Sequence, residues 1–344
     1  MSRSMRFIQR SFAPLNVLAL CGALLTATPA FSGEVRTDHV LGGPKSVAGS
    51  GVGTYDLCAY SRASGSTNDT ATDTAGGTPG GCNPSKITVS HGLVADIFKG
   101  KPIYDPSVGV RGVAKPAGPF GRTITSTTTS EGATATGSAA IAIPAAGGGA
   151  PTLTVNASAS ATDDTQRREA AAEAKDPMFL PADIYPLYAP ALEDLLIDTD
   201  DDDEIAGVAL YAQGFAPGSD DPIFIWDLLI EVVGLADDAD DLLIAFEVDD
   251  SFLPDVVVAD VIAALRAAII FDPVAGAFSL VGPFTLFDVD LVIRSSINFE
   301  EGLAGFIEAV PEPAAGGVFV AGLAALILVR LRRRNQRRRW LSTS

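Results

Sequence analysis

The sequence predicts a mainly β protein whose body is an antiparallel β-sandwich, jelly-roll-like, with one or two short helices. Two observations support this prediction. Apolar residues make up 47% of the 344 residues and charged residues only 19%, so most of the chain can bury a core. In the last third, apolar and β-branched runs recur at short intervals between Gly, Pro and Asp clusters, which is typical of consecutive antiparallel strands.

The strand signals are strongest in the acidic second half. Apolar side chains there run together or alternate with carboxylates, and the expected strands are 205–215, 223–233, 242–248 and 284–299. Trp226 lies inside one of these apolar runs, so we expect it in the core rather than on the surface.

Two segments predict helices. In residues 255–271, apolar side chains recur at the spacing of one helix face, and the pattern stops before Asp272 and Pro273. Residues 163–175 contain a run of Arg, Glu and Ala, which are good helix formers, and predict a short exposed helix.

Residues 123–162 consist almost entirely of Thr, Ser, Ala and Gly and allow two interpretations. Such a composition suits a flexible linker. It also suits a pair of small-residue strands, because Ile141 and Ile143 alternate with alanine, and threonine is common in strands. Strands are the favoured interpretation.

The first 32 residues predict a secretory signal peptide. Arg3, Arg6 and Arg10 form a basic start, an apolar segment follows, and small residues offer a cleavage site near residues 30–33. The apolar run is too short for a membrane anchor. Cys21 suggests a lipoprotein signal, but Leu20 stands where a small residue is needed. We therefore expect export across the inner membrane.

The C-terminal residues 310–344 carry three features in sequence. Pro311, Glu312 and Pro313 come first, an uncharged apolar segment follows, and an Arg-rich tail ends the chain. With Arg330 reaching out to the interface, residues 314–331 predict a short transmembrane helix. The Arg cluster holds its end on the cytoplasmic side.

This tail resembles the PEP-CTERM sorting signal of Gram-negative bacteria, whose motif falls on Pro311, Glu312 and Pro313. The resemblance covers the tail alone. It implies processing by a membrane exosortase, sorting to the cell surface or extracellular matrix, and an association with exopolysaccharide and biofilm. The alternative is an ordinary single-span anchor.

Between the two ends the composition changes twice, and the first change comes near residue 120. Residues 33–120 are rich in Gly, Pro, Ser and Thr, and residues 121–309 form the β-rich acidic domain. Cys58 and Cys82 are the cysteines left after loss of the signal peptide. In an oxidising compartment such a pair forms a disulfide, and without a CxxC motif or a His-rich partner a metal site is disfavoured.

Charge excludes one class of partner and suggests a ligand. The formal charge is −18, and the basic residues gather at the two ends, so the body repels nucleic acid. The run Asp198–Glu204 could hold Ca²⁺ through Asp198, Asp200, Asp202 and Glu204, although it lacks the EF-hand pattern. Residues 237–241 are a second acidic run, expected in a hairpin loop. The alternative for both runs is a solvated loop.

The sequence contains no recognisable catalytic motif. His39 and His91 are its only histidines, and we expect both to be exposed. The favoured function is an exported structural, adhesive or matrix protein, not an enzyme and without an obligatory cofactor. One alternative is a carbohydrate- or calcium-binding module, for which the aromatic candidates are Trp226, Tyr211, Tyr185 and Tyr188. A polysaccharide-active enzyme, which would need two carboxyl groups in one cleft, is the second alternative.

Overall fold

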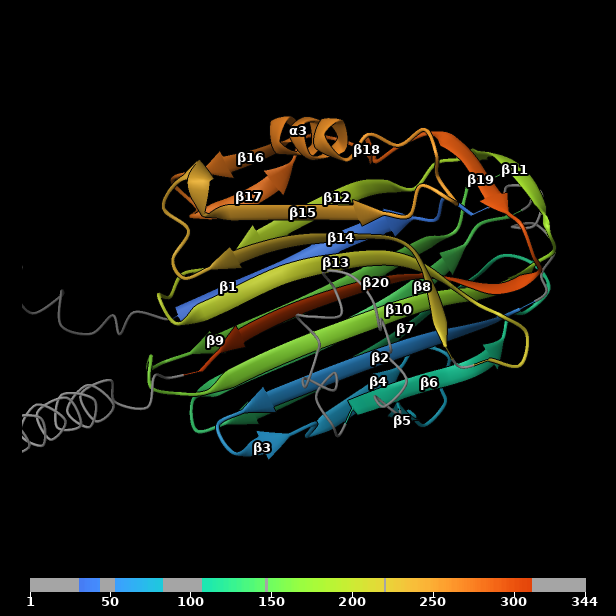
Figure 1. Ribbon diagram of the computed structural model, residues 1–344. Coiled ribbons are helices and arrows are strands. Elements are labelled where there is room, and N and C mark those ends of the chain that lie inside the picture. The colour runs from blue at the N-terminus through green and yellow to red at the C-terminus, as the bar shows by residue number, and fades with distance from the viewer. Residues whose placement is uncertain (1–30, 44–52, 83–106, 146–147, 220, 311–344) are drawn as a thin grey trace, which may run out of the picture.

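Two nine-stranded antiparallel sheets lie face to face in the computed structural model (Figure 1). The structure describes residues 31–43, 53–82, 107–145, 148–219 and 221–310. Within them the protein is mainly β, with antiparallel sheets and a single α-helix, α3 (Val258–Ala268). The expectation of a mainly β, antiparallel body is therefore confirmed.

The first sheet, sheet A, has the strand order β16-β17-β12-β1-β9-β8-β7-β4, with β18 beside β12. Its strands are β1 (Phe31–Val40), β4 (Thr70–Asp73), β7 (Phe120–Ser130), β8 (Ala133–Ile143), β9 (Thr152–Ala161), β12 (Ala191–Asp198), β16 (Ile269–Asp272), β17 (Ala277–Leu280) and β18 (Phe284–Thr285).

The second sheet, sheet B, has the order β15-β14-β13-β20-β10-β2-β6-β5, with β3 beside β2. Its strands are β2 (Thr54–Ala63), β3 (Ser66–Thr67), β5 (Gly80–Cys82), β6 (Ser107–Ala114), β10 (Arg168–Leu180), β13 (Glu204–Phe215), β14 (Pro222–Val233), β15 (Leu242–Val248) and β20 (Ile297–Ala309). Strands β11 (Asp183–Tyr188) and β19 (Val289–Ile293) form a separate pair.

The Thr/Ser/Ala/Gly segment forms strands, so the linker interpretation is wrong. Residues of β9, and of β8 as far as Ile141, alternate between buried and half-buried, and their buried side faces sheet B. The sheets come so close here that a Cβ atom on Gly137 would lie 2.3 Å from the Ala171 carbonyl oxygen and 2.5 Å from that of Tyr60. Small residues are thus what allows this close packing.

Most of the other expected elements are present. Strands β13, β14 and β15 match the three apolar runs, and α3 occupies the helical segment. Trp226 is fully buried, as predicted. The segment 284–299 differs, because it is divided among β18, β19 and the start of β20.

The helix expected over 163–175 is wrong. The chain there enters β10, which pairs with β2 along one edge and with β20 along the other. Nearly every residue of β10 is buried. Cross-strand hydrogen bonds and burial on both faces outweigh the weak helical preference of Ala and Glu.

Strands from both sides of residue 120 pair with each other. In sheet A, β1 lies between β9 and β12, and in sheet B, β2 lies between β6 and β10. The regions 33–120 and 121–309 therefore contribute to the same two sheets. Strand β1 begins at Phe31, inside the segment assigned to the signal peptide.

The predicted signal peptide and transmembrane helix lie almost entirely outside the part of the chain that the structure describes. No helix among the described residues has the length and hydropathy to cross a membrane. The proposed span 314–331, the motif Pro311–Pro313 and residues 1–30 of the signal peptide lie outside the described residues.

Candidate functional site

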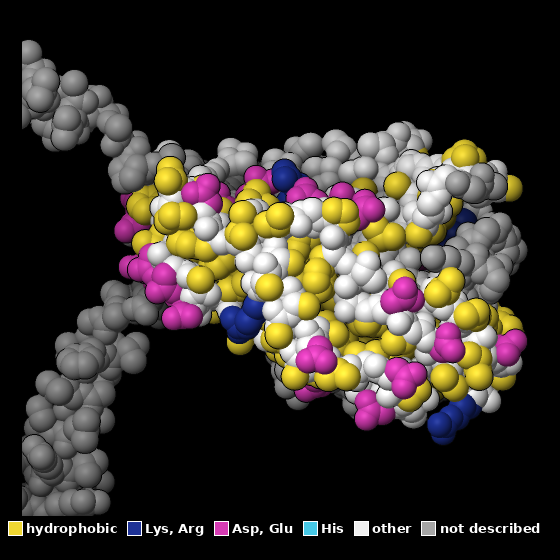
Figure 2. All heavy atoms as spheres, turned by 90° about the horizontal axis from the view of Figure 1, so that it is seen from above, with side chains coloured by type: hydrophobic (Ala, Val, Ile, Leu, Met, Phe, Trp, Pro, Cys, Tyr) yellow, Lys and Arg dark blue, Asp and Glu magenta, His cyan; other side chains and the backbone are white. Residues whose placement is uncertain are grey.

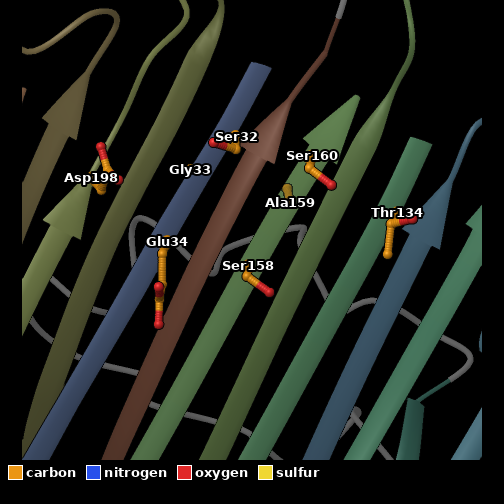
Figure 3. A pocket seen from close by; sticks show the side chains of 8 residues that line it. All are labelled: Ser32, Gly33, Glu34, Thr134, Ser158, Ala159, Ser160 and Asp198. Atoms are coloured by element: carbon orange, nitrogen blue, oxygen red, sulfur yellow. The ribbon is translucent and has the colours of Figure 1, made fainter. Parts of the chain in front are cut away.

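A hollow of about 200 Å³ opens on the outer face of sheet A, close to the start of β1 (Figure 3). It draws on four strands: β1, β8, β9 and β12. The residues that line it are Ser32, Gly33, Glu34, Thr134, Ser158, Ala159, Ser160 and Asp198. Hydroxyl groups and two carboxylates therefore provide its chemistry.

The alternation of side chains along each strand builds this polar face. Buried residues of β7, β8 and β9 face sheet B, so the threonines and serines between them face outward. Strand register aligns them into a row across five strands, which we call the polar row: Thr127, Thr136, Ser158, Glu34 and Asp198. In it, the hydroxyls of Thr127 and Thr136 lie 3.2 Å apart.

The polar row ends in two carboxylates on neighbouring strands. Glu34 and Asp198 are paired directly across β1 and β12. Asn156 Nδ2 donates to Glu34 at 3.2 Å, and Arg36 lies 4.0 Å from the same carboxylate. Burial, followed by the charges of Asp200 and Glu34, raises the pKa of Asp198 to about 6. Asp198 therefore keeps its proton in a sizeable fraction of molecules at slightly acidic pH, where it can donate as well as accept a hydrogen bond.

The turn between β12 and β13 gathers three of the four residues predicted to bind calcium. Asp198 lies in the hollow, the Asp200 backbone N–H donates to Glu204 at 3.1 Å, and Glu204 is fully buried. Asp202 is exposed, and its charge helps to raise the pKa of Asp237 on the other acidic run.

Sequence reasoning missed the cation inside this turn. Arg168, fully buried at the start of β10, donates to Asp201 at 2.9 Å and lies 3.9 Å from Glu204. Burial still raises the pKa of Glu204 to about 7. Arg168 was hidden because the wrong helix prediction placed it on an exposed surface. The turn is thus in part an internal ion pair rather than a purely solvated loop.

The second acidic run forms the hairpin loop expected between β14 and β15. Carboxylate oxygens of Asp237, Asp238 and Asp241 lie within 4.8 Å of one another, which is close enough to hold a metal ion. The Asp241 carboxylate accepts backbone N–H bonds from Asp237 and Asp238 at 3.0 and 3.2 Å. These hydrogen bonds account for the arrangement without an ion.

Both acidic runs lie at one end of the molecule. Figure 2 shows Asp and Glu side chains gathered at the left end, where β1 begins and β20 ends. Asp202 and Asp237 are close enough to interact electrostatically, and Asp164 interacts with Asp201 in the same way. We call this region the acidic end.

A second polar group lies deep inside the sandwich. Glu301 is fully buried and accepts hydrogen bonds from Tyr188 Oη at 2.7 Å and from the backbone of Gly42 and Gly43. Trp226 Nε1 in turn donates to Tyr188 Oη at 2.8 Å. The sequence gives no signal for this group, because its members come from four distant segments.

His39 belongs to the same interior, so its expected exposure is wrong. It is fully buried, with Nδ1 3.1 Å from the Ala191 carbonyl oxygen and Nε2 4.0 Å from Glu301. Every second residue of β1 faces sheet B, and His39 falls on that side. Burial lowers its pKa to about 4, so the ring is neutral. His91 lies outside the described residues.

None of the four aromatic candidates provides an exposed platform for a ligand. Trp226, Tyr211, Tyr185 and Tyr188 are all buried. Tyr211, for example, donates from its hydroxyl to Glu173 at 2.7 Å. A ligand on the outer face of sheet A would therefore meet hydroxyls and carboxylates, not these rings.

Cys58 and Cys82 form a disulfide, with sulfurs 2.01 Å apart and Cα atoms 5.8 Å apart. Their strands β2 and β5 both pair with β6, where Gly109 leaves room for the bridge. A Cβ atom on Gly109 would lie 2.5 Å from the Cys82 sulfur. The bridge fixes the edge strand β5 to the body.

Comparison with known proteins gives no match. No protein-family model matches the chain, and neither curated proteins nor solved structures show significant similarity. The residues and their geometry are therefore the basis for a functional proposal.

Proposed function

We propose that this protein is exported and sorted to the cell surface or extracellular matrix, where its body has a structural or adhesive role. The tail supports the sorting step through its resemblance to exosortase substrates. A disulfide in the body supports an oxidising destination. Peptide mapping without reductant should recover Cys58 and Cys82 as a linked pair from the exported protein. Complete alkylation of both thiols without reductant would contradict export to an oxidising compartment.

The polar row carries the proposal about what the body contacts. Neighbouring strands lie about 4.8 Å apart, so the row offers a regular series of hydrogen-bonding groups to an extended chain. The formal charge of −18 disfavours a polyanion. We therefore expect a neutral, hydroxyl-rich polysaccharide, held by many weak hydrogen bonds.

Affinity electrophoresis through gels containing dextran tests this contact. Retardation should fall in a chain carrying Ser158→Ala and Thr136→Ala, because both hydroxyls belong to the polar row. Thr152→Ala is the matched control, since Thr152 faces outward on the same strand as Ser158 but lies outside the polar row, opposite Ala142. Equal retardation of all three chains, or stronger retardation by the polyanion alginate, would contradict the proposal.

The hollow also brings a polysaccharide-active enzyme into consideration, because Glu34 and Asp198 are opposed within it. We favour binding over hydrolysis. The Glu34 side chain retains 37% exposure and accepts a hydrogen bond from Asn156, so the site is open to water. Release of reducing ends from dextran that stops in an Asp198→Asn chain would establish the enzyme instead.

Calcium binding is the remaining alternative. The favouring observation is the cluster of Asp237, Asp238 and Asp241 oxygens within 4.8 Å. The finer fold prediction, a jelly-roll-like connectivity of the two sheets, also stays a proposal.

A further inference from the structure

The chain enters sheet A directly beside the acidic turn. The Ser32 backbone N–H donates to the Asp200 carboxylate. The ring of Phe31 lies over the Arg168 guanidinium, 5.9 Å from ring centre to Cζ. Glu34, two residues after Ser32, is paired with Asp198. The first residues of β1 are therefore surrounded by the groups of this turn.

The carboxylates of this turn outnumber the cations that contact them in the described part of the chain. Three carboxylates, those of Asp200, Asp201 and Glu204, interact with the guanidinium of Arg168 among the described residues, and Asp198 adds a fourth acidic group near Asp200. Glu204 Oε1 and Asp200 Oδ1 are buried and lack a hydrogen-bond donor in the described part of the chain. The Glu204 side chain is fully buried, and its Oε2 would lie 2.6 Å from a Cβ atom on Gly33. A buried carboxylate oxygen without a donor is costly, so this cluster favours a further cation.

We propose that the cluster of Asp200, Asp201 and Glu204 binds the α-ammonium group that cleavage between Ala30 and Phe31 creates on Phe31. The inference rests on the proposed export, and it assigns the cleavage point and a role for the new terminus. Cleavage there hydrolyses the Ala30–Phe31 peptide bond, so water supplies the hydroxyl of the Ala30 carboxyl group and leaves Phe31 as a protonated amine.

The position fits this role. Consecutive residues of a strand are about 3.3 Å apart along its axis, so the Phe31 nitrogen lies one step from the Ser32 N–H that already contacts Asp200. An ammonium group offers three donors and a full charge. In the uncleaved chain the same nitrogen is a neutral amide with one donor. Removal of the signal peptide would thus complete the charge balance of the turn.

The surrounding charges determine the expected pH dependence. The acidic groups around the turn are Glu34 on β1, Asp164 before β10, and Asp198, Asp200, Asp201 and Glu204, and Arg168 is the cation among them. Glu204, with a pKa of about 7, and Asp198, with a pKa of about 6, are fully negative only above neutral pH. Negative neighbours favour the ammonium form and raise its pKa above the ordinary 7.7–8.0 or so of an α-amine. The stabilisation is fully present below that ordinary pKa and is lost as the pH rises through the raised one.

Two full chains ending at Ser344, kept in mild detergent, test the proposal. One begins at Phe31, and the other begins at Ala27 and so keeps four residues of the signal peptide. The pKa of the terminal amine is measured from the pH profile of acylation by limiting acetic anhydride, followed by peptide mass spectrometry. We expect a value about one unit or more above the ordinary one for Phe31, and an ordinary value for Ala27.

Melting temperatures provide the second readout. The chain that begins at Phe31 should melt about 3 °C higher at pH 7, and the difference should vanish above about pH 10. Glu204→Gln and Asp200→Asn should remove the difference, whereas Glu247→Gln, at an exposed position on β15, should leave it unchanged.

An ordinary pKa at Phe31, or equal melting of the two chains, would overturn the proposal and leave export itself untouched. Export is tested separately by N-terminal sequencing of the secreted protein. A terminus at Phe31 supports both statements, and a terminus at Gly33 would overturn the ammonium site alone.

Discussion

Single residues decide where charge lies inside this protein. His39 and Glu301 were beyond sequence reasoning, because neither residue type is expected in a core, and only the pairing of β1, β12 and β20 encloses them. Burial shifts the pKa of each residue in the direction that favours its neutral form. Burial lowers that of His39 to about 4 and raises that of Glu301 to about 7.

His39 should make the protein sensitive to acid. Its folded pKa of about 4 lies below the ordinary value of 6.5, so its stabilisation is present above pH 6.5 and is lost as the pH falls toward 4. In chemical denaturation from pH 7 to 4, a His39→Gln chain should lose about 3 kcal/mol less than the natural chain. Parallel pH profiles of the two chains would show that His39 is not buried as a neutral ring.

Strands and helices were predictable where one face is exposed. Strands β13, β14 and β15 and helix α3 follow from their apolar patterns, and β8 and β9 from alternation of small residues. Strand β10 was not predictable, because it is buried on both faces and its Ala and Glu residues favour helix locally. The acidic turn was recognised, but its counter-ion Arg168 was lost with the helix error.

The close approach of sheets A and B at β8 gives a stability prediction. Gly137→Val should lower the free energy of unfolding by about 3 kcal/mol, because its side chain would meet backbone atoms of Ala171 and Tyr60. Gly65→Ala is the control, since a Cβ atom there has no neighbour within 4 Å. Equal effects of the two substitutions in urea unfolding would contradict this packing.

The disulfide gives a second prediction at the level of elements. The two cysteines are 24 residues apart in sequence, so the bridge restricts a loop in the unfolded chain. Replacing both by serine should lower the free energy of unfolding by about 3 kcal/mol. Urea unfolding of the oxidised and serine-substituted chains measures this loss, and superimposable curves would mean that the bridge adds no stability.

At the scale of the whole molecule, the acidic end is also the end at which the first strand, β1, begins and the last strand, β20, ends (Figures 1 and 2). Strand β20 ends at Ala309, so the motif Pro311–Pro313 begins two positions after the last strand in the sequence. The sequence predicted the acidic runs but not their convergence, which depends on strand order.

Because many carboxylates lie together at the acidic end, added salt can stabilise the protein either by specific Ca²⁺ binding or by general screening of their charges. If the acidic runs bind Ca²⁺, millimolar Ca²⁺ should raise the melting temperature more than sodium chloride of equal ionic strength, since a ligand of the native state alone stabilises it. Asp200→Ala with Asp202→Ala tests the first run, and Asp238→Ala with Asp241→Ala tests the second. We expect equal shifts in the two salts, because hydrogen bonds and Arg168 already satisfy much of this charge. A calcium-specific shift that either pair removes would contradict that expectation.

The central claim is that the chain is exported and sorted through its tail, leaving the two-sheet body as the product. Intact-mass measurement of protein recovered from the surface of an exosortase-containing host tests it most directly. The expected product begins at Phe31 and ends near Pro311–Pro313. Recovery of protein that still ends at Ser344 from that surface fraction would contradict the claim.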